Sequence, residues 1–116
     1  MEIEIIEGRF AVCQVQDIAG LNFADDFLFI GKTDEELSVV CKEESLPTDR
    51  IACDNGWRAF RVKGALDFAL VGILAKISAT LAEAGISIFA VSTYRTDYVL
   101  VKGEVFEEAV ELIRNV

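Results

Sequence analysis

The sequence predicts an α+β fold built from two related units, on three observations. Its 116 residues are enough for one domain or for two very small units that share a core. The second half alternates between strand-like and helix-like hydrophobic periodicity in the order β-α-β-β-α. The first half repeats part of this pattern, and internal repeats indicate a duplicated structural unit. We expect the two units to span residues 1–55 and 56–116.

The first half is expected to consist mainly of strands. Residues 3–15 alternate apolar and polar side chains with a break at Gly8, which predicts two short strands or one bulged strand. Residues 17–26 read as a loop with at most one helical turn. FLFIGK and ELSVVCKE flank the polar turn 33–36 and predict a hairpin. The segment 43–56 contains the only proline and ends in Asp-Asn-Gly, which predicts a connection with little regular structure.

The second half is expected to contain two helices and three strands. WRAFRVKG (57–64) predicts a strand, and ISIFAVST and DYVLVKG predict a hairpin around the turn at Tyr94 and Arg95. One helix is predicted by apolar residues at helical spacing and ends at a left-handed Gly85: Val71, Leu74, Ile77, Leu81 and Ala84. The last segment, 104–116, predicts a surface helix with acids early and a cation late. Its core face holds Phe106, Ala109, Val110 and Ile113.

The internal repeat can be aligned without a gap. Residues 27–40 slide onto residues 88–101, so that strand meets strand and Glu36 corresponds to Asp97. Upstream of the aligned segments, about a dozen residues connect the preceding strand to the next strand in the first half, and about two dozen do so in the second half. The difference corresponds to about three helical turns. We therefore expect the first unit to have lost most of its first helix.

The composition disfavours several classes of function. The formal charge of −9 repels phosphate backbones and anionic lipids, so we expect no nucleic-acid and no membrane partner. No apolar run reaches the roughly 20 residues that a bilayer requires, and the acidic start is unlike a signal peptide. There is no histidine, which removes the commonest general base and metal ligand. We expect no catalysis, no metal and no cofactor.

The cysteines indicate a reducing, cytoplasmic setting. Cys13, Cys41 and Cys53 are odd in number and form no CxxC pair. We expect them to be buried small hydrophobes.

The segment VGILAKISATLAEAGISIF resembles the ACT domain, a small ligand-binding regulatory module. A glycine, Gly72, opens the helix and Ala84-Gly85 ends it, although Val71 stands where the family usually has proline. With STYRTDYVLV, ELSVVC and GALDFAL, the chain also resembles the paired ACT units of the cytosolic arginine-sensor (CASTOR) family and of aspartate kinase regulation. The resemblance covers nearly the whole chain, most strongly residues 57–101. It implies two ferredoxin-like (βαββαβ-type) units, the first with a shortened first helix.

The resemblance also implies a site for a free amino acid, or a similar small zwitterion, between the two units. The implied residues are Ser38, Val39, Leu70, Val71, Gly72, Thr93, Tyr94 and Asp97. A helix N-terminus at Gly72 suits the ligand carboxylate, and Asp97 suits its ammonium group. Thr93 and Ser38 offer hydroxyls, and Tyr94 offers an apolar wall or a cation–π face. The usual last strand is missing after the final helix, and the N-terminal IEIIE is a candidate to complete that sheet.

Plainer interpretations stand beside this one. Asp97 could bond its own backbone as a turn residue, and Gly72 could permit close packing of helix on sheet. Thr93 and Tyr94 both favour strands. The leading functional hypothesis is a homodimeric amino-acid sensor without enzymatic activity. The alternatives are a protein-interaction module with a vestigial site, and an enzyme using Asp97 with a cysteine, which lacks a histidine to activate the thiol.

Overall fold

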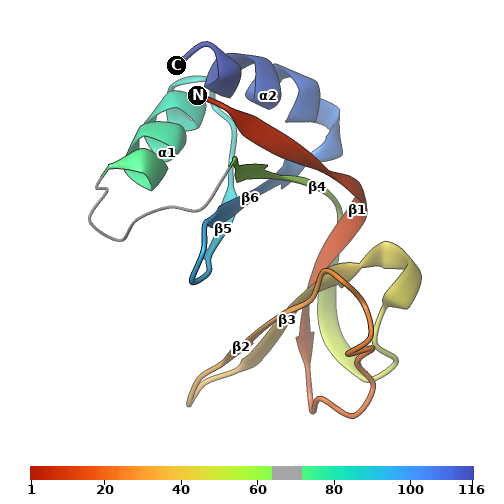
Figure 1. Cartoon of the computed structure of the whole chain (residues 1–116). Coiled ribbons are helices and arrows are strands. Elements are labelled where there is room, and N and C mark those ends of the chain that lie inside the picture. The colour runs from red at the N-terminus through yellow and green to blue at the C-terminus, as the bar shows by residue number, and fades with distance from the viewer. Residues whose placement is uncertain (64–71) are drawn as a thin grey trace. The chain divides into compact units, whose positions relative to one another are not determined.

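The computed structural model describes residues 1–63 and 72–116 (Figure 1). Its mixed α+β architecture confirms the predicted fold class. The elements in chain order are β1 (Ile3–Val15), β2 (Phe29–Lys32), β3 (Leu37–Lys42), η1 (Glu43–Ser45), β4 (Arg50–Val62), α1 (Ile73–Glu83), β5 (Phe89–Ser92), β6 (Asp97–Lys102), η2 (Gly103–Val105) and α2 (Phe106–Arg114). Hydrogen-bonded neighbours follow the order β2-β3-β1-β4-β6-β5. Among the described residues, no helix is long and apolar enough to cross a membrane.

The chain forms two compact units. One comprises Gly8–Trp57, and the other combines Met1–Glu7 with Arg58–Val116. The N-terminal IEIIE, residues 3–7, thus lies entirely in the same unit as residues 58–116. Strands β1 and β4 each contribute to both units, and each carries a left-handed glycine near the boundary: Gly8 with φ 106° and Gly56 with φ 83°.

The first half of β4 corrects the prediction for residues 43–56. That segment was expected to lack regular structure, but from Arg50 onward it is strand. Gly56 does not end the strand, because its left-handed backbone is accommodated within it, as at a β-bulge. The backbone N–H of Gly56 donates a hydrogen bond of 2.7 Å to the Glu43 carboxylate.

The unit Gly8–Trp57 is built from strands. β3 pairs antiparallel with β1, placing Cys13 opposite Val39, and with β2, placing Ile30 opposite Val39 on the other side. Its buried core consists of Ala11, Cys13, Val15, Val39 and Cys41. Every residue of this unit is described, and no α-helix lies between β1 and β2. The predicted loss of the first helix is confirmed.

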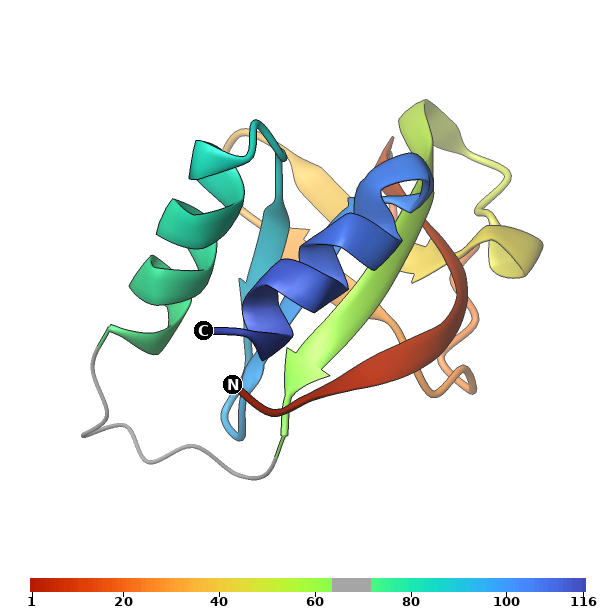
Figure 2. The ribbon, with the colours of Figure 1, turned by 90° about the horizontal axis from the view of Figure 1, so that it is seen from above.

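The other unit packs its two helices on one face of a sheet, as Figures 1 and 2 show. In α1, Ile77 and Leu81 are fully buried, and the helix ends as predicted at Gly85, whose φ is 73°. There the N–H of Ile86 bonds the carbonyl of Leu81, the pattern of a Schellman motif. All four residues predicted for the core face of α2 are buried: Phe106, Ala109, Val110 and Ile113.

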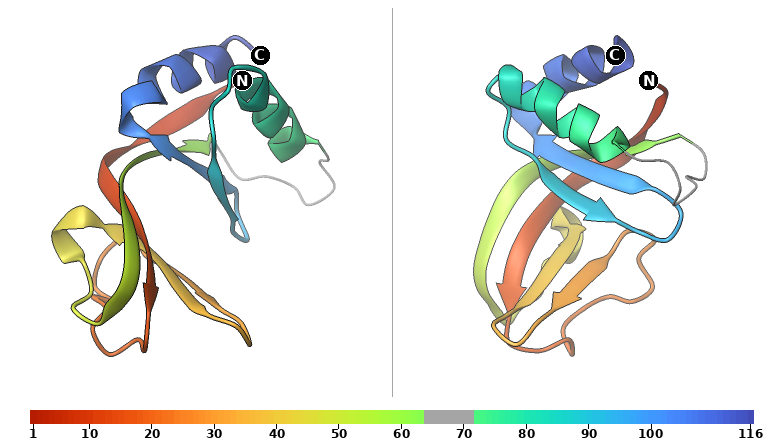
Figure 3. Two further views of the ribbon diagram at one scale, coloured as in Figure 1. Left: turned by 180° about the vertical axis from the view of Figure 1, so that it is seen from behind. Right: turned by 90° about the vertical axis from the view of Figure 1, so that its left-hand side faces the viewer.

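The two hairpins, visible in Figure 3, resemble each other, but in a register that differs from the predicted one. Phe29–Lys32 corresponds to Phe89–Ser92, and the six residues of β3 and of β6 share one burial pattern. Glu36 therefore corresponds to Thr96, and the predicted match of Glu36 with Asp97 is wrong by one residue. Both strand pairs contain continuous apolar runs, which fix the register of an alignment poorly.

Candidate ligand site

The turn between β5 and β6 is closed by Thr93 itself. Its N–H and its hydroxyl both donate to the carbonyl of Thr96, at 2.8 and 3.0 Å. The turn between β2 and β3 is built alike, since Thr33 bonds the carbonyl of Glu36 through its N–H at 2.9 Å. The Thr93 hydroxyl hydrogen is thus engaged within the turn, and its oxygen accepts a bond of 3.4 Å from the N–H of Thr96. One lone pair of that oxygen is left that could accept a bond from a ligand.

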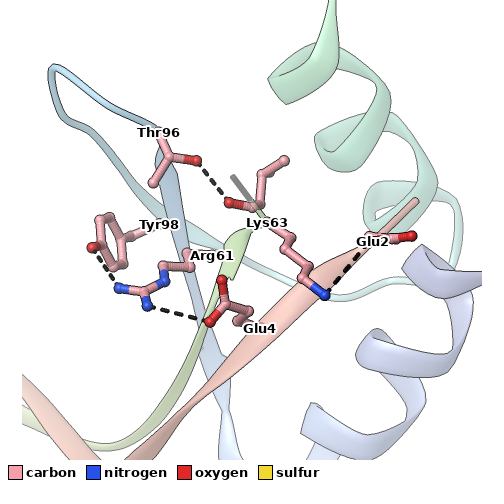
Figure 4. Close-up of polar contacts among 7 residues, drawn as sticks. Glu2, Glu4, Arg61, Lys63, Thr96 and Tyr98 are labelled. Carbon is pink, nitrogen blue, oxygen red and sulfur yellow. Dashed lines mark hydrogen bonds and ion pairs between the residues drawn. The ribbon is translucent and has the colours of Figure 1, made fainter. Parts of the chain in front are cut away.

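Thr96 anchors the same turn to β4. Its side chain is 7% exposed, and its hydroxyl donates a bond of 2.9 Å to the carbonyl of Val62 (Figure 4). No role was predicted for this residue from the sequence. Its signal was weak, because a threonine in a polar turn is ordinary and its partner lies far away in sequence.

Asp97 is held at the first position of β6. It lies opposite Ser92, whose hydroxyl donates a bond of 2.6 Å to the Asp97 carboxylate. The side chain is half-buried. A carboxylate accepts up to about four hydrogen bonds, so Asp97 retains capacity for a cationic group. The interpretation of Asp97 as a turn residue that bonds its own backbone does not describe this bond, which joins two side chains across the hairpin.

Tyr94 stands at the tip of the turn and is 82% exposed. Its ring is therefore largely presented to the outside. The predicted cation–π or apolar-wall role of Tyr94 therefore stays a prediction.

Gly72 is the N-cap of α1 in a left-handed conformation with φ 87°. Its chain neighbours apart, no heavy atom of the described residues lies within 4 Å of the position that a Cβ would occupy. Close packing of helix on sheet therefore does not explain this glycine, whereas its backbone conformation does. No side chain among the described residues caps the helix. The predicted site residues Leu70 and Val71 lie outside the described part of the chain.

Ser38 and Val39 lie on β3 in the unit Gly8–Trp57, whereas Gly72, Thr93, Tyr94 and Asp97 belong to the other unit. Ser38 is half-buried and is opposite Gln14 on one side and Gly31 on the other. Val39 is completely buried in the core of its unit. A contribution of Val39 to a ligand site would come from its backbone.

A polar network that was not predicted crosses the sheet of the unit that combines Met1–Glu7 with Arg58–Val116, called the second unit from here on (Figure 4). The guanidinium of Arg61 donates to the Tyr98 hydroxyl and to the Glu4 carboxylate, each at 3.3 Å. The Tyr98 hydroxyl, and after it Glu4, raise the pKa of Arg61 above its usual value. Because these residues come from β1, β4 and β6, no local sequence pattern could have revealed the network.

A groove of about 480 Å³ also lies on this unit, between α2 and the side chains of Ile5 and Arg58. The Arg58 guanidinium is 4.4 Å from the centre of the Phe106 ring, which lines the same groove. None of the predicted site residues lines it.

Comparison with known families gives two matches. The sequence model of the ACT domain matches residues 52–115, more than half of the chain. A second family model, that of an N-terminal domain, matches residues 8–49. No curated protein matches the chain.

Solved structures resemble the whole chain. A protein from Agobacterium tumefaciens is 31% identical with a TM-score of 0.85, over 97% of this chain and 86% of its own. Aspartate kinase from Clostridium acetobutylicum is 17% identical with a TM-score of 0.70, over 97% of this chain and 33% of its own. The ligand-free regulatory subunit of aspartate kinase from Thermus thermophilus is 12% identical with a TM-score of 0.67, over 99% of this chain and 97% of its own. The two kinase likenesses establish similarity of fold.

Proposed function

Because the chain belongs to the ACT domain family, we propose that it is a regulatory protein that binds a small molecule and catalyses no reaction. We further propose that the ligand is an amino acid held by residues of both units, and that the protein acts as a homodimer. The acidic composition gives no support to a nucleic-acid or membrane partner.

The observation that supports this proposal best is the placement of Asp97. Its carboxylate is fixed by Ser92 and half-buried, yet it keeps acceptor capacity. A fixed carboxylate of this kind suits the ammonium group of an amino acid, because charged hydrogen bonds are stronger than neutral ones. The start of α1 at Gly72, a residue that adds no side chain there, suits the carboxylate of the same ligand.

A second candidate function is a protein-interaction module with a vestigial ligand site. The state of the β5–β6 turn favours it, because the Thr93 hydroxyl bonds within the turn and Tyr94 is largely exposed. Exposed tyrosines are common at protein interfaces.

Thermal unfolding in the presence of each common amino acid distinguishes these functions. A ligand at about a hundred times its dissociation constant adds about 2.7 kcal/mol of stability. For a chain of this size, the expected rise in Tm is about 10 °C. Asp97→Asn should abolish the shift. Asp34→Asn makes the same charge change in the β2–β3 turn and should preserve it.

Two results would contradict the proposal in different ways. A shift that survives Asp97→Asn keeps the function and removes Asp97 from the site. If no amino acid shifts the Tm, the interaction module is the better description, and sedimentation with Tyr94→Ala would test whether the turn mediates self-association.

A further inference from the structure

Three cysteines that are distant in sequence meet in the unit Gly8–Trp57. Cys13 lies on β1, Cys41 on β3 and Cys53 on β4. The sulfur atoms of Cys13 and Cys53 are 2.6 Å apart. Cys13 and Cys41 are buried as predicted, but Cys53 is exposed, so the expectation of three buried thiols is wrong for Cys53.

We propose that Cys13 and Cys53 form a modification site, a dithiol that a peroxide oxidises to a disulfide and that a dithiol reductant reopens. A disulfide bond is about 2.05 Å long, so the two sulfur atoms need to approach by only about half an ångström. The two cysteines lie on strands that are hydrogen-bonded neighbours in the sheet order. The proposal is independent of the ligand and of the proposed regulatory function.

The different surroundings of the two thiols give them different roles. Cys53 is exposed and is therefore the thiol that a small oxidant meets first. Cys13 is 2% exposed. Its burial, and after it the hydrogen bond with Cys53, raise the pKa of the Cys13 thiol. Cys13 therefore does not react with the oxidant first. It serves as the second, resolving thiol because its sulfur already lies 2.6 Å from that of Cys53, and it gives up its proton as the disulfide forms.

The reaction balances with hydrogen peroxide as the oxidant. The Cys53 sulfur attacks one peroxide oxygen, an S–O bond forms, the O–O bond breaks, and the departing hydroxide takes the thiol proton to become water. The Cys13 sulfur then attacks the Cys53 sulfur, the S–S bond forms, the S–O bond breaks, and the second hydroxide leaves as water with the Cys13 proton. Two thiols lose two electrons, and one peroxide is reduced to two waters.

Cys41 is the control within the cluster. It faces the same core as Cys13 and its thiol interacts with that of Cys13, more weakly than the thiol of Cys53 does. In the β1–β3 register Cys41 is opposite Ala11, while Cys13 is opposite Val39. It is also buried, so it does not meet the oxidant first. The geometry therefore assigns the disulfide to Cys13 and Cys53, with Cys41 left as a thiol.

Peptide mapping tests this assignment. The full-length protein is reduced, freed of reductant, exposed to a small excess of hydrogen peroxide, alkylated under denaturing conditions and digested with trypsin. Cleavage after Arg9, Lys32, Lys42, Arg50 and Arg58 places the three cysteines in separate peptides, 10–32, 33–42 and 51–58. We expect peptide 10–32 linked to peptide 51–58, peptide 33–42 alkylated, and full reversal by dithiothreitol. The oxidised protein should also show a Tm several degrees higher, because the bridge restricts the unfolded chain.

Two variants keep the test decisive. Cys53→Ser, at an exposed position, should fold normally and lose both the cross-link and the rise in Tm. Cys41→Ala should retain the cross-link. The proposal is overturned if all three thiols escape oxidation, and are therefore alkylated, at a peroxide dose that fully oxidises a reference dithiol. It is equally overturned if the disulfide includes Cys41, or if the only disulfides join separate chains.

Discussion

The side chain of Thr96 illustrates how a single buried hydroxyl can hold a hairpin. It donates to the carbonyl of Val62 at 2.9 Å, and both atoms are buried. Thr96→Val keeps the shape of the side chain but removes this hydrogen bond, so the Val62 carbonyl loses its hydroxyl partner. We expect the free energy of unfolding to fall by about 1–2 kcal/mol, measured by urea denaturation.

Thr80→Val is the matched control for this substitution. The Thr80 hydroxyl bonds the carbonyl of Lys76 at 2.8 Å on an exposed part of α1, where water can replace it. Its effect should stay within about 0.5 kcal/mol. Equal decreases in the free energy of unfolding of the two variants would show that the buried Thr96 bond contributes no more to stability than the exposed Thr80 bond.

The buried thiol of Cys13 predicts an alkaline loss of stability. Its pKa is raised by burial, so the folded chain retains a proton that the unfolded chain loses above the ordinary cysteine pKa of about 8.5. The stability contribution is complete below that pH and declines as the pH rises above it. Urea denaturation at pH 7 and pH 10 under reducing conditions should show a smaller decline for Cys13→Val than for the natural chain. The same decline in both proteins would show that Cys13 does not control it.

At the scale of elements, the two ends of α1 depend on glycines in the same backbone conformation. Gly72 and Gly85 have φ of 87° and 73°, and, chain neighbours apart, no heavy atom in the described part of the chain lies within 4 Å of a Cβ added to either one. Gly72→Ala and Gly85→Ala should therefore each cost about 1–2 kcal/mol through backbone strain alone. If the helix start binds ligand, only Gly72→Ala should also weaken binding, as isothermal titration with a stabilising amino acid would measure. Equal affinities in the two variants would remove Gly72 from the site.

The elements also show which structural features the sequence could predict. The helices were predictable because their apolar faces and the Gly85 cap are local signals, each contained within a few turns. The first half of β4 was not, since Asp-Asn-Gly is a turn signal and only the pairing of distant strands makes Gly56 part of a strand. The β5–β6 turn was located correctly, but the bond that the Thr96 hydroxyl donates and the contacts of Arg61 depend on residues more than thirty positions away.

At the scale of the whole molecule, the second unit is discontinuous in sequence. It joins Met1–Glu7 to Arg58–Val116. Ile3 is 7% exposed and belongs to the same core cluster as Phe60 and Ile77. The N–H of Lys63 bonds the carbonyl of Glu2 at 3.0 Å, and Arg61 bonds Glu4. The first seven residues thus supply both a buried side chain and a partner strand for β4.

A fragment of residues 56–116, the second unit as the sequence divides it, tests the importance of this N-terminal strand. Without residues 1–7, the fragment loses the Ile3 side chain and leaves β4 without its partner on that side, so we expect no cooperative thermal transition in circular dichroism. Joining residues 1–7 to the fragment through a flexible Gly/Ser linker should restore one. In the joined fragment, Ile3→Ala should lower the stability by about 2–4 kcal/mol, whereas Ile5→Ala, at a side chain 40% exposed, should have a much smaller effect. Cooperative unfolding of the unjoined fragment would show that the division at residue 55 already separates two independent units.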